Sequence, residues 1–282
     1  MFGFLNVYKP VGMTSHDVVA KLRKLTNIKQ IGHTGTLDPF AEGVLPVCIG
    51  KATRLIEFLD DDKEYLATVQ FGVSTTTYDR EGEITFSSDK KVTVENIKSS
   101  LTEFQGEILQ YPPIYSAIKV KGKKLYEYAR SGQQVDIQPR KVIIEKIELK
   151  LFDEKLQQAE ILIKCSKGTY IRSIANDLGN KLECGAHLTK LVRTQAGKFR
   201  IEDSVNLESL DADKNLINPV DMLSYPKVAV TSKDIEYIRN GRALKNQNIK
   251  HGSIVILIYN ENEICAVGTA DNDLIKLKKV FL

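Results

Sequence analysis

Residues 32–39 read GHTGTLDP, and residues 43–50 read GVLPVCIG. The two glycines of the first segment permit backbone angles that other residues avoid, and Pro39 moves Asp38 away from the helical region. We expect a tight loop that holds one carboxylate in a fixed direction, backed by a short buried strand over residues 44–49. A rigid support under a polar loop is typical of an active site. The alternative is a structural turn in which Asp38 only bonds its own backbone.

The composition is that of an ordinary globular protein, with 42% hydrophobic and 27% charged residues among 282. This length suits one large domain and one small domain. The chain has no apolar run of about 18 residues and no secretory signal, so we expect no membrane attachment. Its four cysteines form no C-x-x-C pair, and its four histidines show no ligand spacing. These absences disfavour a disulfide framework and a metal site, and they are typical of the reducing cytoplasm.

Basic residues are concentrated in two regions, although the net charge is only +4. Residues 111–141 contain seven Lys or Arg against two acidic residues, and residues 226–282 contain nine against six. Such regions suit a polyanion such as RNA. A solvated, lysine-rich surface is the alternative.

Apolar periodicity predicts strands and helices that interleave without a strict βαβ repeat. We therefore expect an α+β fold with a mixed, largely antiparallel central sheet flanked by helices. The first helix has Thr14 and Asp17 at capping-box spacing. The expected helices are 17–25, 52–59, 94–104, 124–130 and 169–182, and the expected strands are 64–71, 142–152 and 160–165.

A second, smaller unit is expected at the C-terminal end. Residues 211–225 are polar at first and precede Pro226, as in a linker. The segment beyond contains short strand patterns and turns, which predict a small β-rich domain. We expect a large domain over residues 1–222 and a small domain over residues 226–282.

The sequence points to chemistry that rests on a carboxylate. It contains no Walker loop, no G-x-G-x-x-G after a strand and no G-x-S-x-G elbow. At residues 165–172 a strand pattern ends, a glycine turns the chain and a helix begins. Arg172 in that first turn could pair with a distant carboxylate and keep it anionic. A surface pair with Asp177 is the alternative.

Tyr65 lies in an alternating strand pattern. A tyrosine at such a position is more often part of the core than of a site. Its ring would matter if it faced the same pocket as Asp38, where a flipped base could stack on it.

Together these segments closely resemble the bacterial tRNA pseudouridine-55 synthases, which isomerise one uridine in the T-loop of tRNA. They occur in the family's order and span most of the first 200 residues. The matching segments are residues 9–18 (KPxGxTSxDV), 32–39 (GHTGTLDP), 63–65 (KxY), 78–82 (YDxxG), 112–119 (PPxYSAxK), 122–130 (GxxLYExAR) and 165–172 (CSKGTYIR).

The resemblance implies roles for the three candidate residues. Asp38 matches the catalytic aspartate, which attacks the uridine so that the base can turn and rejoin through carbon. Tyr65 matches the tyrosine that stacks on the flipped base and is implicated in proton removal at the new carbon attachment. Arg172 matches the arginine that pairs with the aspartate.

It also implies how RNA is bound. His33 matches a histidine that takes part in opening the T-loop, and Tyr170 matches another pocket residue. Basic residues in the matched segments are expected to bind RNA: Lys9, Lys119, Arg130 and Lys167. The family uses no metal or organic cofactor, and the C-terminal segment resembles its small β-barrel RNA-binding (PUA) domain. We expect a cytoplasmic monomer that acts on the T-arm of tRNA.

Two other functions stay open on the sequence. One is an RNA-binding or chaperone module with an idle catalytic centre. The other is a related synthase that works inside guide-RNA particles, whose longer RNA-binding extensions are not seen here. Two positions depart from the family pattern. Near Asp136 the family usually has an arginine that this chain lacks, although Arg140 is present, and residues 191–193 contain one arginine where relatives often have two. Both concern expected phosphate contacts.

Overall fold

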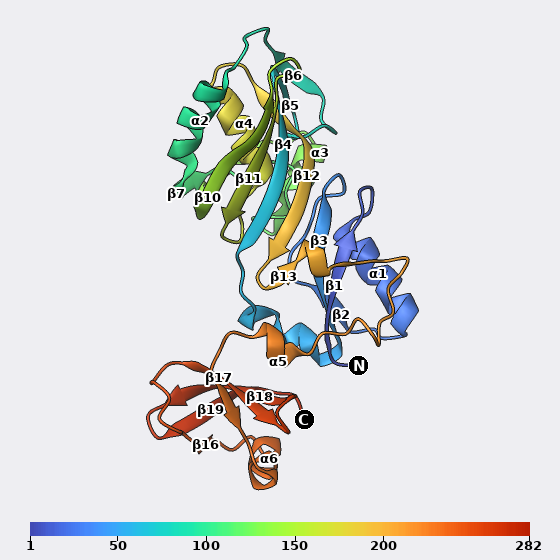
Figure 1. Cartoon of the computed structure of the whole chain (residues 1–282), viewed down its shortest axis with the longest axis vertical. Coiled ribbons are helices and arrows are strands. Elements are labelled where there is room, and N and C mark those ends of the chain that lie inside the picture. The colour runs from blue at the N-terminus through green and yellow to red at the C-terminus, as the bar shows by residue number, and fades with distance from the viewer.

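The computed structural model describes residues 1–282. A ten-stranded mixed sheet forms the centre of the larger part of the molecule (Figure 1). Its order is β14-β1-β3-β12-β4-β11-β10-β7, with β2 beside β3 and β13 beside β12. Only the pairs β1–β14 and β3–β12 are parallel, which confirms the expected mixed, largely antiparallel sheet. The strands are β1 (Gly3–Lys9), β2 (Ile31–His33), β3 (Glu42–Ile49), β4 (Lys63–Phe71), β7 (Gly106–Gln110), β10 (Arg140–Asp153), β11 (Gln158–Cys165), β12 (Ala186–Ala196), β13 (Phe199–Arg200) and β14 (Val205–Asn206).

The parallel pair β3–β12 joins the two halves of this sheet. At their contact, a Cβ added to Gly43 would lie 2.4 Å from the carbonyl oxygen of Arg193, so only glycine allows the two strands to approach this closely. Gly43 also has a φ of +105°, which other residues rarely adopt. Two small two-stranded sheets stand apart from the large one: β5 (Val73–Thr75) with β6 (Ile84–Ser87), and β8 (Lys119–Val120) with β9 (Lys123–Lys124).

The helices cover the sheet in two groups. α2 and α4 pack in the core cluster of the β4–β12 half, and α1 packs in that of the β1–β3 half (Figure 1). The predicted capping box of α1 is present, since Thr14 and Asp17 bond each other's backbone N–H. The helices are α1 (Ser15–Thr26), α2 (Val94–Leu101), α3 (Leu125–Arg130), α4 (Ile171–Lys181), α5 (Pro219–Met222) and α6 (Ser232–Arg239), with 3-10 turns η1 (Gly50–Phe58), η2 (Thr102–Phe104) and η3 (Ile201–Asp203).

Several elements differ from the sequence prediction. Residues 52–59 lie mostly in the 3-10 turn η1 and not in an α-helix. α4 begins at Ile171, because Gly168 has a φ of +82° and Tyr170 is still extended. The sequence predicts no strand at the positions of β1, β7 and β12. β12 mixes buried apolar residues with Lys190 and Thr194, and this blurs its alternation.

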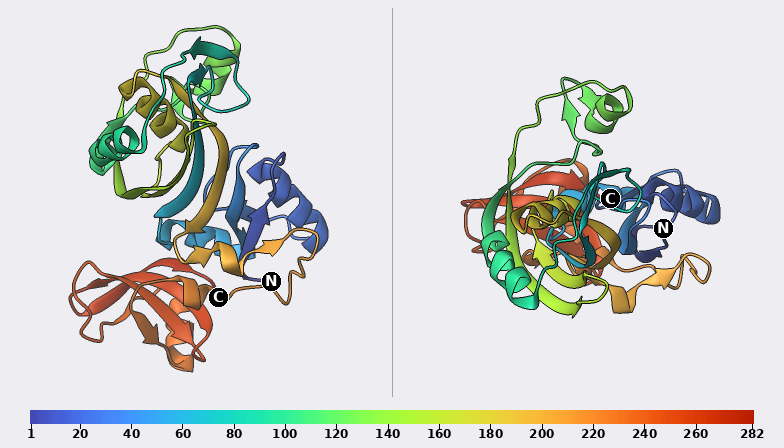
Figure 2. Two further views of the ribbon diagram at one scale, coloured as in Figure 1. Left: turned by 45° about the horizontal axis from the view of Figure 1, so that its top comes forward. Right: turned by 90° about the horizontal axis from the view of Figure 1, so that it is seen from above.

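The β-rich C-terminal domain predicted from the sequence is present. Its five strands follow the order β15-β17-β18-β19-β16, and α6 packs beside them. The strands are β15 (Lys227–Ala229), β16 (Leu244–Lys245), β17 (Ile254–Tyr259), β18 (Glu263–Asp271) and β19 (Leu274–Val280). The C-terminal domain lies at one end of the elongated molecule (Figures 1 and 2).

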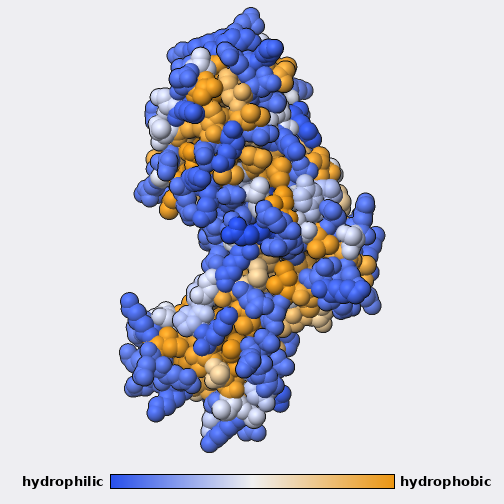
Figure 3. Space-filling view, viewed as in Figure 1, coloured by the Kyte–Doolittle hydropathy of each residue, from blue (hydrophilic) through white to orange (hydrophobic).

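The segment that the sequence presents as a polar linker is packed. Val220 of α5 and Leu223 are buried in one cluster with Ile256 and Phe281 of the C-terminal domain. Lys51 Nζ in η1 also donates to the Phe281 carbonyl at 2.9 Å. The surface is hollowed between the small domain and the far end of the large sheet (Figure 3). The domain limits at 222 and 226 stay a prediction.

Candidate active site

The loop between β2 and β3 carries Asp38 and is held from below. Ser15 Oγ at the start of α1 accepts the Leu37 N–H at 2.8 Å and donates to the Leu37 carbonyl at 3.2 Å. The Gly12 N–H donates to the Pro39 carbonyl at 2.8 Å. Asp38 is therefore flanked by two fixed backbone positions, as the sequence predicted for a tight loop.

Lys9 supports the same loop from inside the protein. Its side chain is fully buried, and Nζ donates to the carbonyls of Met13 at 2.6 Å, Pro10 at 2.9 Å and Pro39 at 3.4 Å. Burial lowers the pKa of Lys9 to about 8. The expectation that Lys9 binds RNA is wrong for this geometry, because the ammonium group has no access to solvent. Lys9 joins the turn after β1 to the Asp38 loop.

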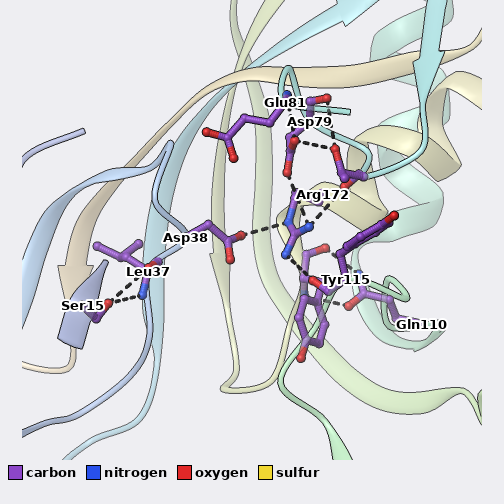
Figure 4. A network of polar contacts seen from close by, with 10 residues as sticks. Ser15, Leu37, Asp38, Asp79, Glu81, Gln110, Tyr115 and Arg172 are labelled. Carbon is purple, nitrogen blue, oxygen red and sulfur yellow. Dashed lines mark hydrogen bonds and ion pairs between the residues drawn. The ribbon is translucent and has the colours of Figure 1, made fainter. Parts of the chain in front are cut away.

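Arg172 reaches Asp38 from the first turn of α4. Its Nε lies 2.9 Å from Asp38 Oδ2, which confirms the predicted ion pair (Figure 4). The guanidinium also donates to the carbonyls of Tyr115 at 3.1 Å and Thr77 at 3.2 Å. The alternative pair between Arg172 and Asp177 is not formed. Three segments far apart in the sequence thus fix the orientation of one arginine.

A second carboxylate, from Asp79, shares this arginine. Asp79 Oδ2 lies 3.4 Å from Arg172 Nη1, and Oδ1 accepts from Thr77 Oγ1 at 2.6 Å and from the Glu81 N–H at 3.0 Å (Figure 4). Its side chain is only 5% exposed. Asp79 lies in the matched segment 78–82, but the sequence alone predicts no role for it. Its place before Gly82 in a polar loop was the available signal.

The electrostatics of the pair favour a reactive carboxylate. Burial raises the pKa of the Asp38 carboxyl above its usual value, and Asp79 raises it further. Arg172 opposes both effects by its charge and its hydrogen bond. The Asp38 side chain remains 36% exposed, whereas that of Arg172 is 6% exposed. The anion is thus partly removed from water, stabilised on one side by Arg172 and open on the other.

The open side faces a cavity of about 450 Å³. Asp38 and Arg172 line it together with Tyr65, Tyr170 and Lys167. Other lining residues come from the same loops and from the segment that follows β7, including Tyr115 and Tyr126. Tyr65 therefore faces the same pocket as Asp38, which is the arrangement that base stacking on its ring requires.

Tyr65 is both a core residue and a cavity residue. It is 7% exposed and belongs to the main apolar cluster. Burial raises the pKa of its phenol. Tyr170 precedes α4, where its backbone exchanges two hydrogen bonds with the Gln110 side chain, of 2.8 and 3.0 Å. Burial raises the pKa of Tyr170 as well.

Of the other predicted RNA contacts, Lys167 lines the edge of this cavity, whereas His33, Lys119 and Arg130 lie outside its lining. His33 ends β2, outside the cavity lining, and burial lowers its pKa, which favours the neutral ring. Lys119 and Arg130 are exposed in the segment that carries β8, β9 and α3, with Arg130 5.5 Å from the centre of the Tyr126 ring. Lys167 at the cavity edge pairs with Asp61 at 2.6 Å.

Three further features of the structure bear on the kind of site. No three His, Cys, Asp or Glu side chains are grouped so that they could hold a metal ion. No helix has both the length and the apolar character needed to cross a bilayer. All four cysteines are free and buried.

Comparison with known proteins gives consistent results. Residues 23–171 match the family model described as "TruB family pseudouridylate synthase (N terminal domain)", and residues 172–223 match "tRNA pseudouridylate synthase B C-terminal domain". The chain is 45% identical to tRNA pseudouridine synthase B of Caldanaerobacter subterraneus, over 99% of both chains. It is also 45% identical to the protein of that name from Carboxydothermus hydrogenoformans, over 100% of this chain and 99% of the relative.

Solved structures agree on the fold. A structure of a Cbf5-Nop10-Gar1 complex contains a chain with a TM-score of 0.74 and 28% identity, covering 100% of this chain and 85% of that one. A chain of an H/ACA RNP bound to a substrate RNA containing 2′-deoxyuridine gives a TM-score of 0.72 and 26% identity, with the same coverage.

The fold and the site around Asp38 thus define a pseudouridine synthase. Within that class, the chain belongs to the TruB family of pseudouridylate synthases.

Proposed function

We propose that this protein converts the uridine at position 55, in the T-loop of tRNA, to pseudouridine. The observation that carries the proposal is the 2.9 Å contact between Asp38 and Arg172 at a cavity that Tyr65 also lines. The near-complete coverage of relatives named tRNA pseudouridine synthase B supports tRNA as the substrate. The chain covers only 85% of the guide-RNA-particle chains and is less similar to them, so that function is disfavoured.

The cavity suits a single flipped base. Its volume of about 450 Å³ lies in the range of small-molecule sites, about 300 to 1,000 Å³. A base stacked in an RNA loop must leave its stack before a side chain can reach it, which costs a few kcal/mol. Tyr65 and Tyr170 offer aromatic surface at the cavity, and stacking on such rings offsets part of this cost.

Each polar residue of the cavity has a role in the proposed reaction. Asp38 attacks the uridine, and the loop held by Ser15 keeps its carboxylate in the attack position. Arg172 stabilises the aspartate anion and fixes its direction. Tyr65 takes the proton from the carbon through which the base rejoins the sugar.

RNA binding is assigned to the basic regions around the cavity. Lys119 and Arg130 are exposed beside the cavity residue Tyr126, and Lys167 lies at the cavity edge. The C-terminal domain, with nine basic and six acidic residues over 226–282, is the second basic region. Contacts of this kind to phosphates make affinity fall with salt.

The protein is further expected to act as a cytoplasmic monomer without a metal or an organic cofactor. Size-exclusion chromatography with light scattering would give a mass near 31.7 kDa. Activity is expected to be the same with and without EDTA. A dimer, or activity lost with EDTA and restored by a metal, would contradict these expectations.

The test of the function uses the whole chain and an unmodified tRNA transcript. Pseudouridine is mapped by carbodiimide labelling and primer extension, with a transcript that carries cytidine at position 55 as control. We expect one modified uridine, in the T-loop, and none in the control. No product at that uridine refutes the proposal and leaves an RNA-binding or chaperone module as the explanation.

A further inference from the structure

Arg193 of β12 is a buried cation that the proposed mechanism does not use. Its side chain has no exposed surface. Nε donates to the Val44 carbonyl at 2.7 Å, and Nη2 donates to the Gly35 carbonyl at 3.1 Å. Nη1 is buried without a hydrogen-bond partner of standard geometry. Arg193 is the single arginine of residues 191–193, where relatives often have two, and its burial gives it no access to a phosphate.

The charge of Arg193 is also uncompensated. It forms no ion pair with a carboxylate, unlike the other buried arginine, Arg172, which has two. A buried charge is costly unless a counter-charge or hydrogen bonds stabilise it. Nη1 therefore remains a donor that can still bind one anion or acceptor.

The strand register places Tyr65 next to this group. Arg193 and Tyr65 are direct partners in the antiparallel β4–β12 pair, so their side chains leave the sheet on the same face. A Cβ on the cavity residue Gly35 would lie 3.7 Å from Nη1, which places this nitrogen under the cavity wall. The free donor and the phenol are thus on one side of the sheet, at the cavity.

We propose that Arg193 is a positioning residue that stabilises the phenolate form of Tyr65 through Nη1. The proposal rests on the proposed function for its meaning in catalysis. A neutral phenol is a weak base, whereas a phenolate held by a guanidinium can accept a proton. The unpaired Nη1 donor gains a strong acceptor when Tyr65 becomes an anion.

The proton transfer balances as a tautomerisation. After the base has joined C1′ of the ribose through C5, that carbon still carries its hydrogen. The Tyr65 phenolate takes this proton, and the C–H electron pair forms the C5–C6 double bond. The π pair of the C6–N1 double bond, which the C5-linked ring holds at this stage, moves onto N1, and N1 takes up a proton from solvent. Tyr65 is left as a phenol, which loses its proton to solvent before the next turnover. Arg193 keeps all its protons throughout.

Other charged groups near the phenol act in different directions. Burial raises the pKa of Tyr65, and the charge and hydrogen bonding of Arg193 lower it. Cys165 of β11 and Asp38 of the loop raise it further. Lys63, two residues before Tyr65, also lines the cavity. Among these groups, Arg193 is the cation whose charge lowers the pKa of Tyr65.

The test measures the phenol directly in the free protein. Tyr65→3,5-difluorotyrosine places a ¹⁹F reporter at this position and lowers the intrinsic phenol pKa into a range where the fold survives. The pKa is read by ¹⁹F NMR in the parent protein, in Arg193→Met and in Lys9→Met. Lys9→Met is the matched control, because it removes another fully buried cation that supports the same loop by carbonyl bonds.

We expect Arg193→Met to raise the phenol pKa by about one to three pH units, as for loss of an adjacent opposite charge. Lys9→Met is expected to leave it unchanged. An unchanged pKa in Arg193→Met, or an equal rise in both variants, overturns the proposal. If circular dichroism shows that Arg193→Met is unfolded, Arg193→Lys decides: a smaller rise supports the proposal, and a parental value overturns it.

Activity gives the second readout. In single turnovers with Tyr65 in place, Arg193→Lys is expected to lose rate at neutral pH and to regain it as the pH rises. Difluorotyrosine at position 65 is expected to restore part of the neutral rate, since its phenolate forms more readily. A loss that is equal at every pH and is not restored indicates a structural role and overturns the proposal. The NMR result needs no RNA, so it stands or falls separately from the proposed function.

Discussion

The loop that carries Asp38 and the basic segment between β7 and β10 border the same cavity but are built in opposite ways. The loop is tied by Ser15 and the buried Lys9 and faces an arginine with four polar partners. The basic segment carries β8, β9 and α3, whose two strands pair only with each other. It projects from the body of the molecule (Figure 2, right).

This difference separates two tasks. An attacking carboxylate must be held in place before the substrate arrives, because misplacement lowers the rate steeply. Lysines that contact phosphates need only charge and reach. We therefore expect changes in the fixed loop to lower the rate of the chemical step. Changes in the basic segment should instead weaken tRNA binding.

Asp38→Asn should have the largest effect. It keeps the size of the side chain but removes the attacking anion, so turnover should fall by at least about a thousandfold. Mapping of pseudouridine in single-turnover reactions measures this loss. Activity at a tenth of the starting rate would rule out the role given to Asp38.

Arg172→Met should lower the rate by about a hundredfold or more, since it leaves a desolvated carboxylate without its partner. It should also change the pH profile. Asp38 must be ionised, so activity rises as the pH rises through its pKa, which burial already raises. Without Arg172 that pKa rises further, and the acid limb should move to higher pH. An unmoved acid limb would separate Arg172 from the ionisation of Asp38, and Arg172→Lys should give an intermediate shift.

Ser15→Ala should have an intermediate effect. It leaves the buried Leu37 N–H unpaired, which costs about 1 to 3 kcal/mol of stability and loosens the loop. We expect about a tenfold loss of rate, of the size that 1.4 kcal/mol gives. Thr14→Ala is the control, because it removes the helix cap at a cost of about 1 kcal/mol without touching the loop. Equal rates in the two variants would show that the loop does not depend on Ser15.

Charge removal in the basic segment should have the smallest effect on chemistry. Lys119→Gln with Lys121→Gln should weaken tRNA binding and reduce the slope of log Kd against log salt by about two. The rate at saturating tRNA should stay at the parental value. Filter binding over a salt series measures the slope, with the exposed pair Lys91→Gln and Lys155→Gln as control. An unchanged slope would place the phosphate contacts elsewhere.

The sequence predicts the reacting residues of the Asp38 loop better than it predicts the buried residues that support this loop. Asp38 and Arg172 lie in segments that match the family in order, and this resemblance implies their pairing. The residues alone also allowed a pair between Arg172 and Asp177. Lys9 reads as a surface cation, yet its carbonyl partners bury it completely. The position of Arg193 depends on the register of β12 against β4, which no local pattern determines.

The same limit applies to the elements themselves. β12 carries lysine and threonine among its apolar residues, so its place at the centre of the sheet is set by pairing with β3 and β4. The segment before Pro226 is polar enough to read as a linker, yet Val220 and Leu223 pack against the C-terminal domain. Contacts between distant segments, which composition does not record, decide both cases.

The most direct test asks whether the Asp38 loop serves the chemical step and the basic segment serves tRNA binding. Single-turnover rates at saturating tRNA and tRNA affinity are measured in parallel for Asp38→Asn and for the Lys119→Gln, Lys121→Gln double variant. The account predicts parental affinity without product for the first, and weakened affinity with the parental rate constant for the second. Product from Asp38→Asn, or a rate constant in the double variant that stays low at saturation, would contradict it.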